Sequence, residues 1–181
     1  MEAMRNEVPL GKLDDEVFSR LVLDYRERIF LLILKYVRNR DDARDLTQDV
    51  FVRAYRSREG FRGESSPYTW LYRIAVNLAL NFKSRGRDSS LVSIEESPEP
   101  VRDEGISQSI LGRELAQRID SAVTRLPARQ RMVFVLRYYE DKPHAEIAGL
   151  LGITEGAVKA NFHQALTKLR EGLAPYLKGE I

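Results

Sequence analysis

The chain has 181 residues, no cysteine and a formal net charge of only +2, with 31% charged and 43% hydrophobic residues. This length suits one domain or two small ones, and the lack of cysteine excludes disulfides and thiolate metal sites and suits a reducing compartment. The longest apolar run, Ile29 to Leu34, is far below the roughly 20 residues needed to cross a bilayer. Because no apolar core of signal-peptide length stands near the N-terminus, the composition predicts a cytosolic protein.

The charges are unevenly distributed along the chain. Residues 50–87 hold 8 basic and 2 acidic side chains, whereas residues 88–105 hold 1 basic and 6 acidic side chains. Residues 106–181 are again basic, with 11 basic and 8 acidic side chains. Two basic blocks on either side of an acidic spacer predict two separate surfaces that face polyanions.

The first helix is predicted to begin after Asp14 or Asp15, either of which can cap it, and to stop at Asn39 and Arg40. Apolar residues recur between these points with the period of a helix. This regular spacing assigns them to the core, without a functional role: Phe18, Leu21, Val22, Tyr25, Ile29, Leu32, Ile33 and Tyr36.

A second helix is predicted from Asp41 to Ser57, with an apolar face and an opposite acidic face. Three interpretations of the acidic face remain open. It is a solvated stripe, which is the commonest fate of surface charge, or a metal site formed by carboxylates without His or Cys, or a face that docks on a basic partner protein. The side chains concerned are Asp42, Asp45, Gln48 and Asp49.

A loop and a third helix follow within the basic block. The segment from Phe61 to Pro67, FRGESSP, has the Gly, Ser and Pro content of a loop, and a helix is predicted from Tyr68 to Lys83. Aromatic rings interleaved with Arg and Asn suit single-stranded nucleic acid, because bases stack on the rings while cations hold phosphates. The alternative is that the rings belong to the core, which we favour for Trp70.

The predicted fold class is all-α, with two small helical bundles joined by a flexible acidic linker. The first bundle takes residues 1–87, the linker residues 88–107, and the second bundle residues 108–181. The linker contains Ser, Glu and two prolines without apolar periodicity. The chain has no strand-like alternation, Gly-rich phosphate loop or catalytic dyad, so no cofactor and no enzymatic activity are predicted.

The most informative stretch runs from His144 to Arg170. Gly152 follows a short apolar helical pattern at a position that needs a left-handed backbone, and Thr154 can cap the next helix. That helix is predicted to bury Val158, Phe162, Ala165, Leu166 and Leu169 and to present polar and basic side chains outward. The pattern predicts a helix-turn-helix whose second helix can enter a DNA major groove, although an ordinary helical hairpin is the alternative.

In this order the motifs resemble a known family, the extracytoplasmic-function (ECF) sigma factors, a two-domain branch of the sigma factors of bacterial RNA polymerase. The resemblance runs from about Phe18 to Leu173. It rests on DDARDLTQDVFVRAY, FRGESSPYTWLYRIAVNLALNF, LPARQRMVFVLRYYED and HAEIAGLLGITEGAVKANFHQALTKLR. It implies a dissociable subunit that binds core RNA polymerase and directs promoter-specific initiation and promoter melting, often under the control of an anti-sigma factor.

The resemblance also implies three sets of contact residues. The contacts with core polymerase would be Asp45, Gln48 and Asp49. The contacts with the minus-ten promoter element would be Phe61, Arg62, Gly63, Glu64, Ser65, Tyr68, Arg73 and Asn77. The contacts with the minus-thirty-five element would be Thr154, Glu155, Lys159, Ala160, Asn161, His163, Gln164, Lys168 and Arg170, of which the last two suit phosphates.

The implied mechanism couples melting to recognition. A non-template base would be flipped into a pocket beside the FRGESSP loop, which offsets an unstacking cost of a few kcal/mol. Pro67 stands where family members often carry an aromatic residue, and Ala160 and Gln164 stand where an arginine would be a strong base reader. The linker resembles a segment near the RNA exit path. In the free protein we expect the tether to leave the two halves uncoordinated, with weak binding to promoter duplex.

Two other functions remain open from the residues alone. A stand-alone helix-turn-helix regulator that binds an operator would explain the stretch from His144 to Arg170, but not the acidic helix or the basic loop. A helical adaptor that binds only proteins would predict no loss of DNA binding when Lys159 and Gln164 are changed to Ala.

Overall fold

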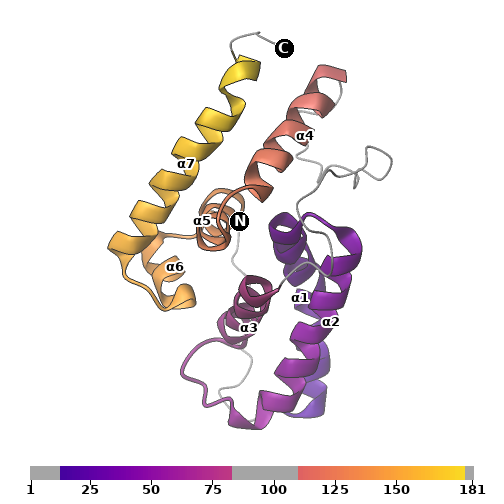
Figure 1. The fold of residues 1–181 in the computed structure, drawn as a ribbon. Helices are drawn as coiled ribbons and strands as arrows, with labels where there is room; N and C mark the ends of the chain where they lie inside the picture. Colours follow the sequence, from indigo (N-terminus) through magenta and orange to yellow (C-terminus); the bar gives the residue numbers. More distant parts are fainter. Residues whose placement is uncertain (1–12, 83–109, 178–181) are drawn as a thin grey trace, which may run out of the picture.

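The structure is a computed structural model that describes residues 13–82 and 110–177. These residues form helices and connecting turns without any strand, so the all-α prediction is confirmed (Figure 1). The first half contains α1 (Asp15–Val37), α2 (Arg40–Ser57), the 3-10 turn η1 (Arg58–Gly60) and α3 (Pro67–Asn81). The second half contains α4 (Ile110–Thr124), α5 (Ala128–Phe134), the π-helical turn η3 (Val135–Tyr139), α6 (His144–Leu151) and α7 (Glu155–Leu177). The predicted linker, 88–107, lies outside the described residues.

Side-chain caps fix where the helices of the first half begin. Asp14 accepts the Val17 amide at 2.8 Å, as the sequence predicts, and the Asn39 side chain accepts the Asp42 amide at 2.9 Å. The Ser66 hydroxyl accepts the Thr69 amide at 3.1 Å, and Pro67 takes the first helical position of α3. Each cap satisfies an amide that the helix itself leaves unpaired. The loop that starts at Phe61 is thus joined to α3 by a defined turn.

The three helices of the first half pack against one another around an apolar centre. The fully buried side chains include Ile29 and Ile33 of α1, Val50 of α2 and Leu71 and Val76 of α3. In α1 the buried residues follow the predicted helical period, whereas Val76 and Tyr72 of α3, which are 0% and 1% exposed, were not assigned to the core from spacing. Within the two described stretches, no helix is both long enough and apolar enough to span a membrane.

The predicted helix-turn-helix is confirmed as α6, a tight turn and α7. Gly152 has a φ of 63° and ends α6, and the Ile153 amide donates to the Ala148 carbonyl at 3.1 Å. The Thr154 hydroxyl then accepts the Ala157 amide at 3.2 Å and caps α7. Both contacts are local, so the sequence is sufficient to specify this turn.

One residue of the predicted buried stripe of α7 is placed differently. Val158, Ala165 and Leu169 are buried and Phe162 is half-buried, but Leu166 is 39% exposed, so its prediction as a core residue is wrong. Successive residues of a helix are separated by about 100° of rotation, which turns Leu166 away from the strip that Ala165 and Leu169 present. The buried apolar stripe of α7 is therefore narrower than its sequence suggests.

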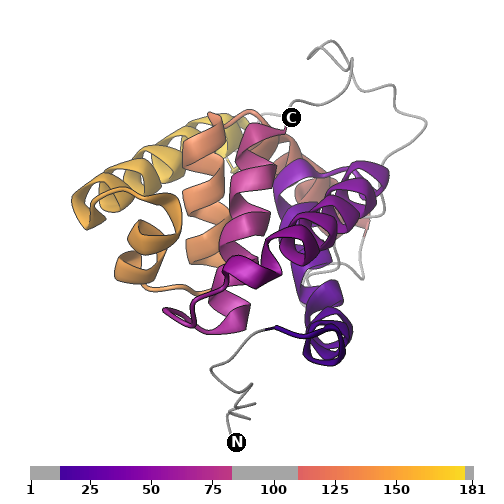
Figure 2. The ribbon, with the colours of Figure 1, turned by 90° about the horizontal axis from the view of Figure 1, so that it is seen from below.

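The two halves are packed together in the structure. Figure 2 shows α3 between α5 and the pair α1 and α2. Buried residues of both halves belong to one apolar cluster, in which Leu71 and Tyr72 of α3 join Met132, Leu136 and Ile147 of the second half. The expectation of two halves left uncoordinated by the tether is therefore not what the structure shows.

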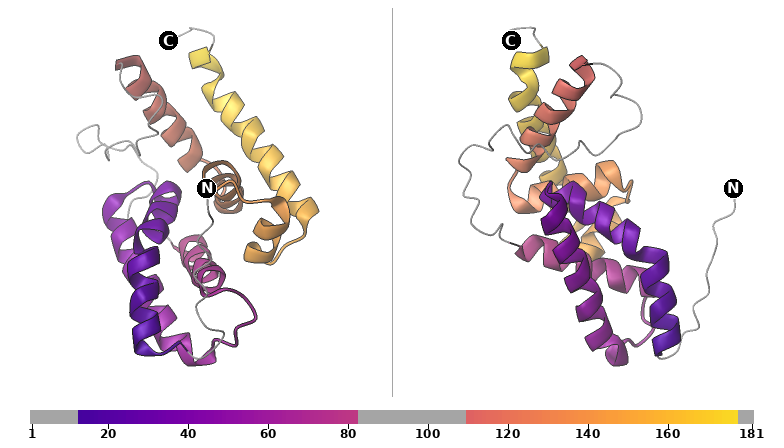
Figure 3. Two further views of the ribbon diagram at one scale, coloured as in Figure 1. Left: turned by 180° about the vertical axis from the view of Figure 1, so that it is seen from behind. Right: turned by 90° about the vertical axis from the view of Figure 1, so that its right-hand side faces the viewer.

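A second, smaller cluster holds the end of the molecule that is formed by α4 and α7. These two helices run side by side, with α5 at their base, in Figures 1 and 3. The buried side chains of this cluster come from α4, α5, α7 and the turn after α4: Val123, Leu126, Phe134, Ala165 and Leu169. The cluster supports α7 over its middle turns, so the helix keeps a fixed direction beyond the helix-turn-helix.

We predict opposite effects for two glycine substitutions, one inside α6 and one at its C-cap. Gly152→Ala should lower the free energy of unfolding by about 1–2 kcal/mol, because a Cβ is disfavoured at a φ of 63°. Gly149→Ala should raise it by about 0.5–1 kcal/mol, since this glycine is inside the helix and its added Cβ would meet nothing within 4 Å. Urea denaturation followed by circular dichroism measures both, and equal effects of the two changes would contradict the helix-ending role of Gly152.

Candidate protein-docking and nucleic-acid interfaces

The acidic face of α2 is open to solvent. Asp45, Gln48 and Asp49 are all exposed, while the neighbouring Leu46 and Val50 are buried in the core. The helix therefore presents the three candidate docking side chains on one surface without using them for its own packing. Asp41, one turn before them, forms an exposed ion pair with Arg44 at 3.3 Å, and such pairs contribute about 0–1 kcal/mol.

A groove between α1 and α2 lies beside this face. It has a volume of about 910 Å³, and its apolar lining includes Val22, Phe30 and Phe51. Gln48 and Arg44 also line it, so the groove and the acidic face share a border. An apolar groove next to exposed polar side chains is the arrangement expected of a surface that binds another protein.

The sequence predictions missed two exposed apolar residues at this groove. Val52 is 39% exposed and Tyr55 is 42% exposed, and both line the groove. The Tyr55 ring is held in place by Arg58, whose guanidinium lies 3.7 Å from the ring centroid, and its hydroxyl donates to Asp15 at 3.3 Å. Their positions in the sequence could have revealed this exposure, because they do not follow the helical spacing of the buried residues of α2, which are Ala43, Leu46, Val50 and Ala54.

The FRGESSP loop and α3 form a second candidate surface. Arg62 and Glu64 are exposed, and Gly63 has a φ of 71°. Phe61 contacts Trp70 at 5.4 Å between ring centroids, which ties the start of the loop to α3. Trp70 is half-buried against the core, in agreement with its predicted role.

The structure separates the predicted minus-ten residues into two groups. Arg73 and Asn77 are exposed and lie one turn apart on α3, on a face left open to a ligand. Tyr68 lies elsewhere on the helix, since five residues correspond to about 140° of rotation. Its ring contacts Tyr25 at 4.9 Å and Tyr72 at 5.2 Å. Tyr68 therefore does not share one open surface with Arg73 and Asn77 in this structure.

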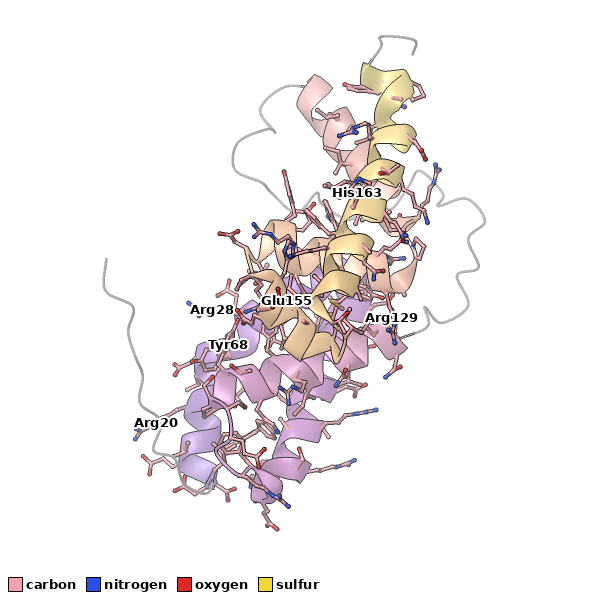
Figure 4. The ribbon with its side chains drawn as sticks, turned by 90° about the vertical axis from the view of Figure 1, so that its left-hand side faces the viewer. Arg20, Arg28, Tyr68, Arg129, Glu155 and His163 are labelled. Carbon is pink, nitrogen blue, oxygen red and sulfur yellow. The ribbon has the colours of Figure 1, made fainter. Side chains whose placement is uncertain are left out.

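The third candidate surface is the outer face of α7. Its candidate side chains are exposed, apart from a half-buried Asn161. Figure 4 shows Glu155 at the start of the helix and His163 further along it, so the polar face extends over more than one turn of α7. The exposed members are Thr154, Glu155, Lys159, Ala160, His163, Gln164, Lys168 and Arg170.

Besides Thr154, which caps α7, two of these side chains are already engaged within the protein. The Asn161 amide donates to the Ala157 carbonyl at 2.7 Å, which turns it back along its own helix. Gln164 accepts a hydrogen bond at 2.7 Å from Gln130, a buried residue of α5. The remaining candidates are exposed and make no side-chain hydrogen bond to another described residue: Glu155, Lys159, Ala160, His163, Lys168 and Arg170.

Buried and half-buried charges line the contact between the halves. Arg131 of α5 donates to the Tyr36 carbonyl of α1 at 3.3 Å and to the Thr124 carbonyl of α4 at 2.6 Å. A cation is favoured at carbonyls that end a helix, because those carbonyls lack amide partners and carry the negative end of the helix dipole. Burial lowers the pKa of Arg131, and the neighbouring Tyr36 opposes this effect.

Four tyrosines of the same region have raised pKa values. Burial raises the pKa of Tyr68 to about 12, with a further contribution from the charge of Glu140. Burial is also the largest cause of the raised pKa of Tyr36, Tyr72 and Tyr139. Arg131 beside Tyr36 and Arg38 beside Tyr139 partly oppose this effect. The packing of the two halves therefore favours the protonated hydroxyls.

The side chains of residues 13–82 and 110–177 do not form a metal site. No group of three His or carboxylate side chains in these stretches is close enough to hold an ion. His144 begins α6, and its ring lies 6.2 Å from the Phe162 ring, whereas His163 is exposed on α7.

Comparison with protein families gives two matches in the same order as the two halves. Residues 21–88 match the model for sigma-70 region 2, and residues 116–169 match the model for sigma-70 region 4. The RNA polymerase sigma-H factor of Pseudomonas aeruginosa is 32% identical over 174 residues, which cover 91% of this chain and 90% of that protein. The ECF RNA polymerase sigma-E factor of Escherichia coli is 32% identical over 176 residues, which cover 92% of each.

Two solved structures have the same fold. CnrH, in complex with the cytosolic domain of CnrY, superposes with a TM-score of 0.65 and 22% identity, over 89% of this chain and 90% of that chain. The sigma factor RpoE of Bartonella quintana, in complex with the anti-sigma factor NepR, superposes with a TM-score of 0.62 and 22% identity, over 87% and 96%. On the sequence matches, the chain belongs to the ECF RNA polymerase sigma factors, which confirms the resemblance noted from its motifs.

We predict that the protein loses stability as the pH rises above about 10, the pKa of tyrosine in an unfolded chain. The folded pKa of each of the four tyrosines is raised, so the folded state keeps protons that the unfolded state releases. Urea denaturation at a series of pH values should show this fall, with a smaller slope for Tyr72→Phe. An equal slope in that variant would contradict the buried protonated state of Tyr72.

Proposed function

We propose that the exposed face of α2 docks this sigma factor on core RNA polymerase. The observation that carries the proposal is that Asp45, Gln48 and Asp49 are exposed together beside the groove between α1 and α2. A partner with basic and apolar side chains would find both charge complementarity and an apolar seat there. In the bound state the protein is the subunit that selects the promoter, and it carries out no chemical step of its own.

The first DNA-reading surface that we propose consists of the FRGESSP loop and the exposed face of α3. Arg62 and Arg73 supply cations for phosphates, and Asn77 supplies donor and acceptor groups for an unstacked base. Ser66 and Pro67 join the loop to the helix, so that a base held by the loop would also lie near α3. Recognition of an extruded base would make melting of the minus-ten element part of binding.

The second proposed DNA-reading surface is the outer face of α7, which would enter the major groove of the minus-thirty-five element. Lys159 and His163 are exposed and their side chains donate no hydrogen bond to another described residue, and the exposed Ala160 offers a methyl group for apolar contact with thymine. Lys168 and Arg170, further along the helix, suit the phosphate backbone. The sequence-specific part of the contact thus falls in the first turns of α7.

Two further features complete the proposal. RpoE of Bartonella quintana was solved with the anti-sigma factor NepR, and CnrH was solved with the cytosolic domain of CnrY. We propose that an anti-sigma factor likewise binds this protein and limits its access to polymerase. Since core polymerase and the promoter are reached inside the cell, we place the protein in the cytoplasm.

The docking proposal predicts the behaviour of a double charge reversal. Asp45→Lys with Asp49→Lys should weaken binding to core polymerase on the order of 100-fold, because like charges brought together at an interface cost several kcal/mol. Binding can be measured by biolayer interferometry with immobilised core enzyme, and circular dichroism verifies the fold.

The matched control is Glu16→Lys with Glu171→Lys, which makes the same change in charge at exposed positions that are not part of α2. Its affinity for core polymerase should stay close to that of the unmodified protein. If both double variants bind equally well, α2 is not the docking face, and if both lose binding, the effect is one of net charge.

A further inference from the structure

Gln130 is a polar residue at a position where the spacing of α5 predicts an apolar one. It precedes Val133 and Phe134 by three and four residues, so the three side chains share one face of the helix. Val133 and Phe134 are buried in the core, and Gln130 is itself only 9% exposed. A polar side chain at a core position is most often found where function, rather than packing, requires it.

The hydrogen bonds of Gln130 are incomplete. Its Nε2 donates to the Oε1 of Gln164 on α7 at 2.7 Å. Its own Oε1 is buried and has no hydrogen-bond partner among the described residues. A buried acceptor without a partner costs free energy, and a leucine of similar volume would fill the site without that cost. Stability therefore does not account for Gln130, and the one hydrogen bond of its amide is with the outer face of α7.

We propose that Gln130 is a positioning residue that fixes the amide of Gln164 as a hydrogen-bond donor, so that this part of α7 selects guanine over adenine in the major groove. The inference rests on the proposed function, because it concerns the face of α7 that enters the minus-thirty-five element. It adds the class of base that Gln164 reads and a specificity-determining residue that lies outside that face.

The hydrogen bond joins two rigidly supported helices. α5 packs against α7 (Figures 1 and 3), and Phe134 of α5 shares one buried cluster with Ala165 and Leu169 of α7. Ala165 follows Gln164 directly in the sequence, so core packing fixes the backbone on both sides of the hydrogen bond. An exposed glutamine ordinarily samples several rotamers, and its ordering on a ligand costs conformational entropy. For Gln164 this ordering takes place on folding, before DNA binds.

The direction of the hydrogen bond determines which base suits Gln164. A free glutamine amide offers one acceptor and two N–H donors, and it pairs with adenine by accepting from N6 and donating to N7. In this structure the Oε1 is turned toward Gln130, which leaves the two N–H groups of Nε2 as the outward-facing part of an exposed side chain. Guanine presents two acceptors, O6 and N7, whereas adenine presents a donor beside its single acceptor. A fixed donor therefore favours guanine.

This arrangement also bears on the residue type at position 164, where an arginine would be a strong base reader. Arginine reads guanine because it brings only donors to O6 and N7. A glutamine whose oxygen is held from behind likewise presents only donors, without the positive charge. Gln130 thus gives Gln164 the hydrogen-bonding character of the stronger reader.

The test measures base preference with the complete holoenzyme. Core polymerase and the full chain transcribe a promoter library whose minus-thirty-five element is randomised, and the transcripts are sequenced. Gln164→Ala identifies the base pair that this residue reads, since only there is the preference lost. At that base pair the unmodified protein should favour guanine over adenine by about five- to tenfold.

Gln130→Leu should lower the ratio of guanine to adenine at the same base pair by about tenfold, because the released amide can pair with adenine through both of its groups. The preferences at the other base pairs should not change. Gln130→Met, which keeps the unbranched shape, takes its place should the leucine variant not fold. The matched control is Gln117→Leu, the same change at an exposed position of α4, and its preferences should equal those of the unmodified protein.

A second variant reverses the hydrogen bond. In Gln130→Glu, measured at about pH 8 where the carboxylate is ionised, residue 130 can only accept. Gln164 must then donate to it, which turns the Oε1 outward as an acceptor. The preference at the same base pair should move from guanine to the bases that present a donor, cytosine through N4 and adenine through N6.

A preference for adenine at that base pair in the unmodified protein would overturn the assigned direction of the hydrogen bond. An unchanged ratio of guanine to adenine in Gln130→Leu, or a uniform loss of transcription without any change in preference, would leave Gln130 with a structural role only and overturn the inference. If the unmodified holoenzyme shows no preference at any base pair of the element, α7 does not read DNA, and the proposed function fails together with the inference.

Discussion

The packing of the second half against α3 and the end of α1 is the interaction on which the arrangement of this protein depends. It places Tyr72, Met132 and Ile147 from both halves in one apolar cluster, and it surrounds that cluster with buried or half-buried charges. An apolar cluster stabilises the contact without fixing its geometry, whereas Arg38 and Arg131 determine which surfaces meet. Arg38 of the first half donates to Asp120 and Tyr139 of the second, and Arg131 of the second half donates to the Tyr36 carbonyl of the first.

This constraint explains the distribution of exposed functional groups. The acidic face of α2, the face of α3 with Asn77 and the outer face of α7 all point away from the shared core. Only Tyr68, among the candidate contact residues, is drawn toward the opposite half. The proposed docking face and most of the two proposed DNA-reading surfaces therefore stay exposed while the halves are packed together.

Much of the fold could be predicted because its determinants are local. Asp14, Ser66, Gly152 and Thr154 act within a few residues of their own positions, so the caps and the helix-turn-helix follow from short patterns. The exposure of Leu166 and the contact between the halves could not be predicted in the same way, since they depend on residues that are distant in sequence. The exposed apolar residues of the groove, Val52 and Tyr55, were missed for a different reason. Their residue types are common in protein cores, so their presence in the sequence did not indicate an exposed surface.

The central claim is that this polypeptide gives core RNA polymerase a preference for particular promoters. Run-off transcription with purified core enzyme on a library of genomic promoters tests it most directly, with and without the added protein. The account predicts defined transcripts from a small set of promoters that appear only when the protein is present. Initiation that is no more selective with the protein than without it would contradict the account.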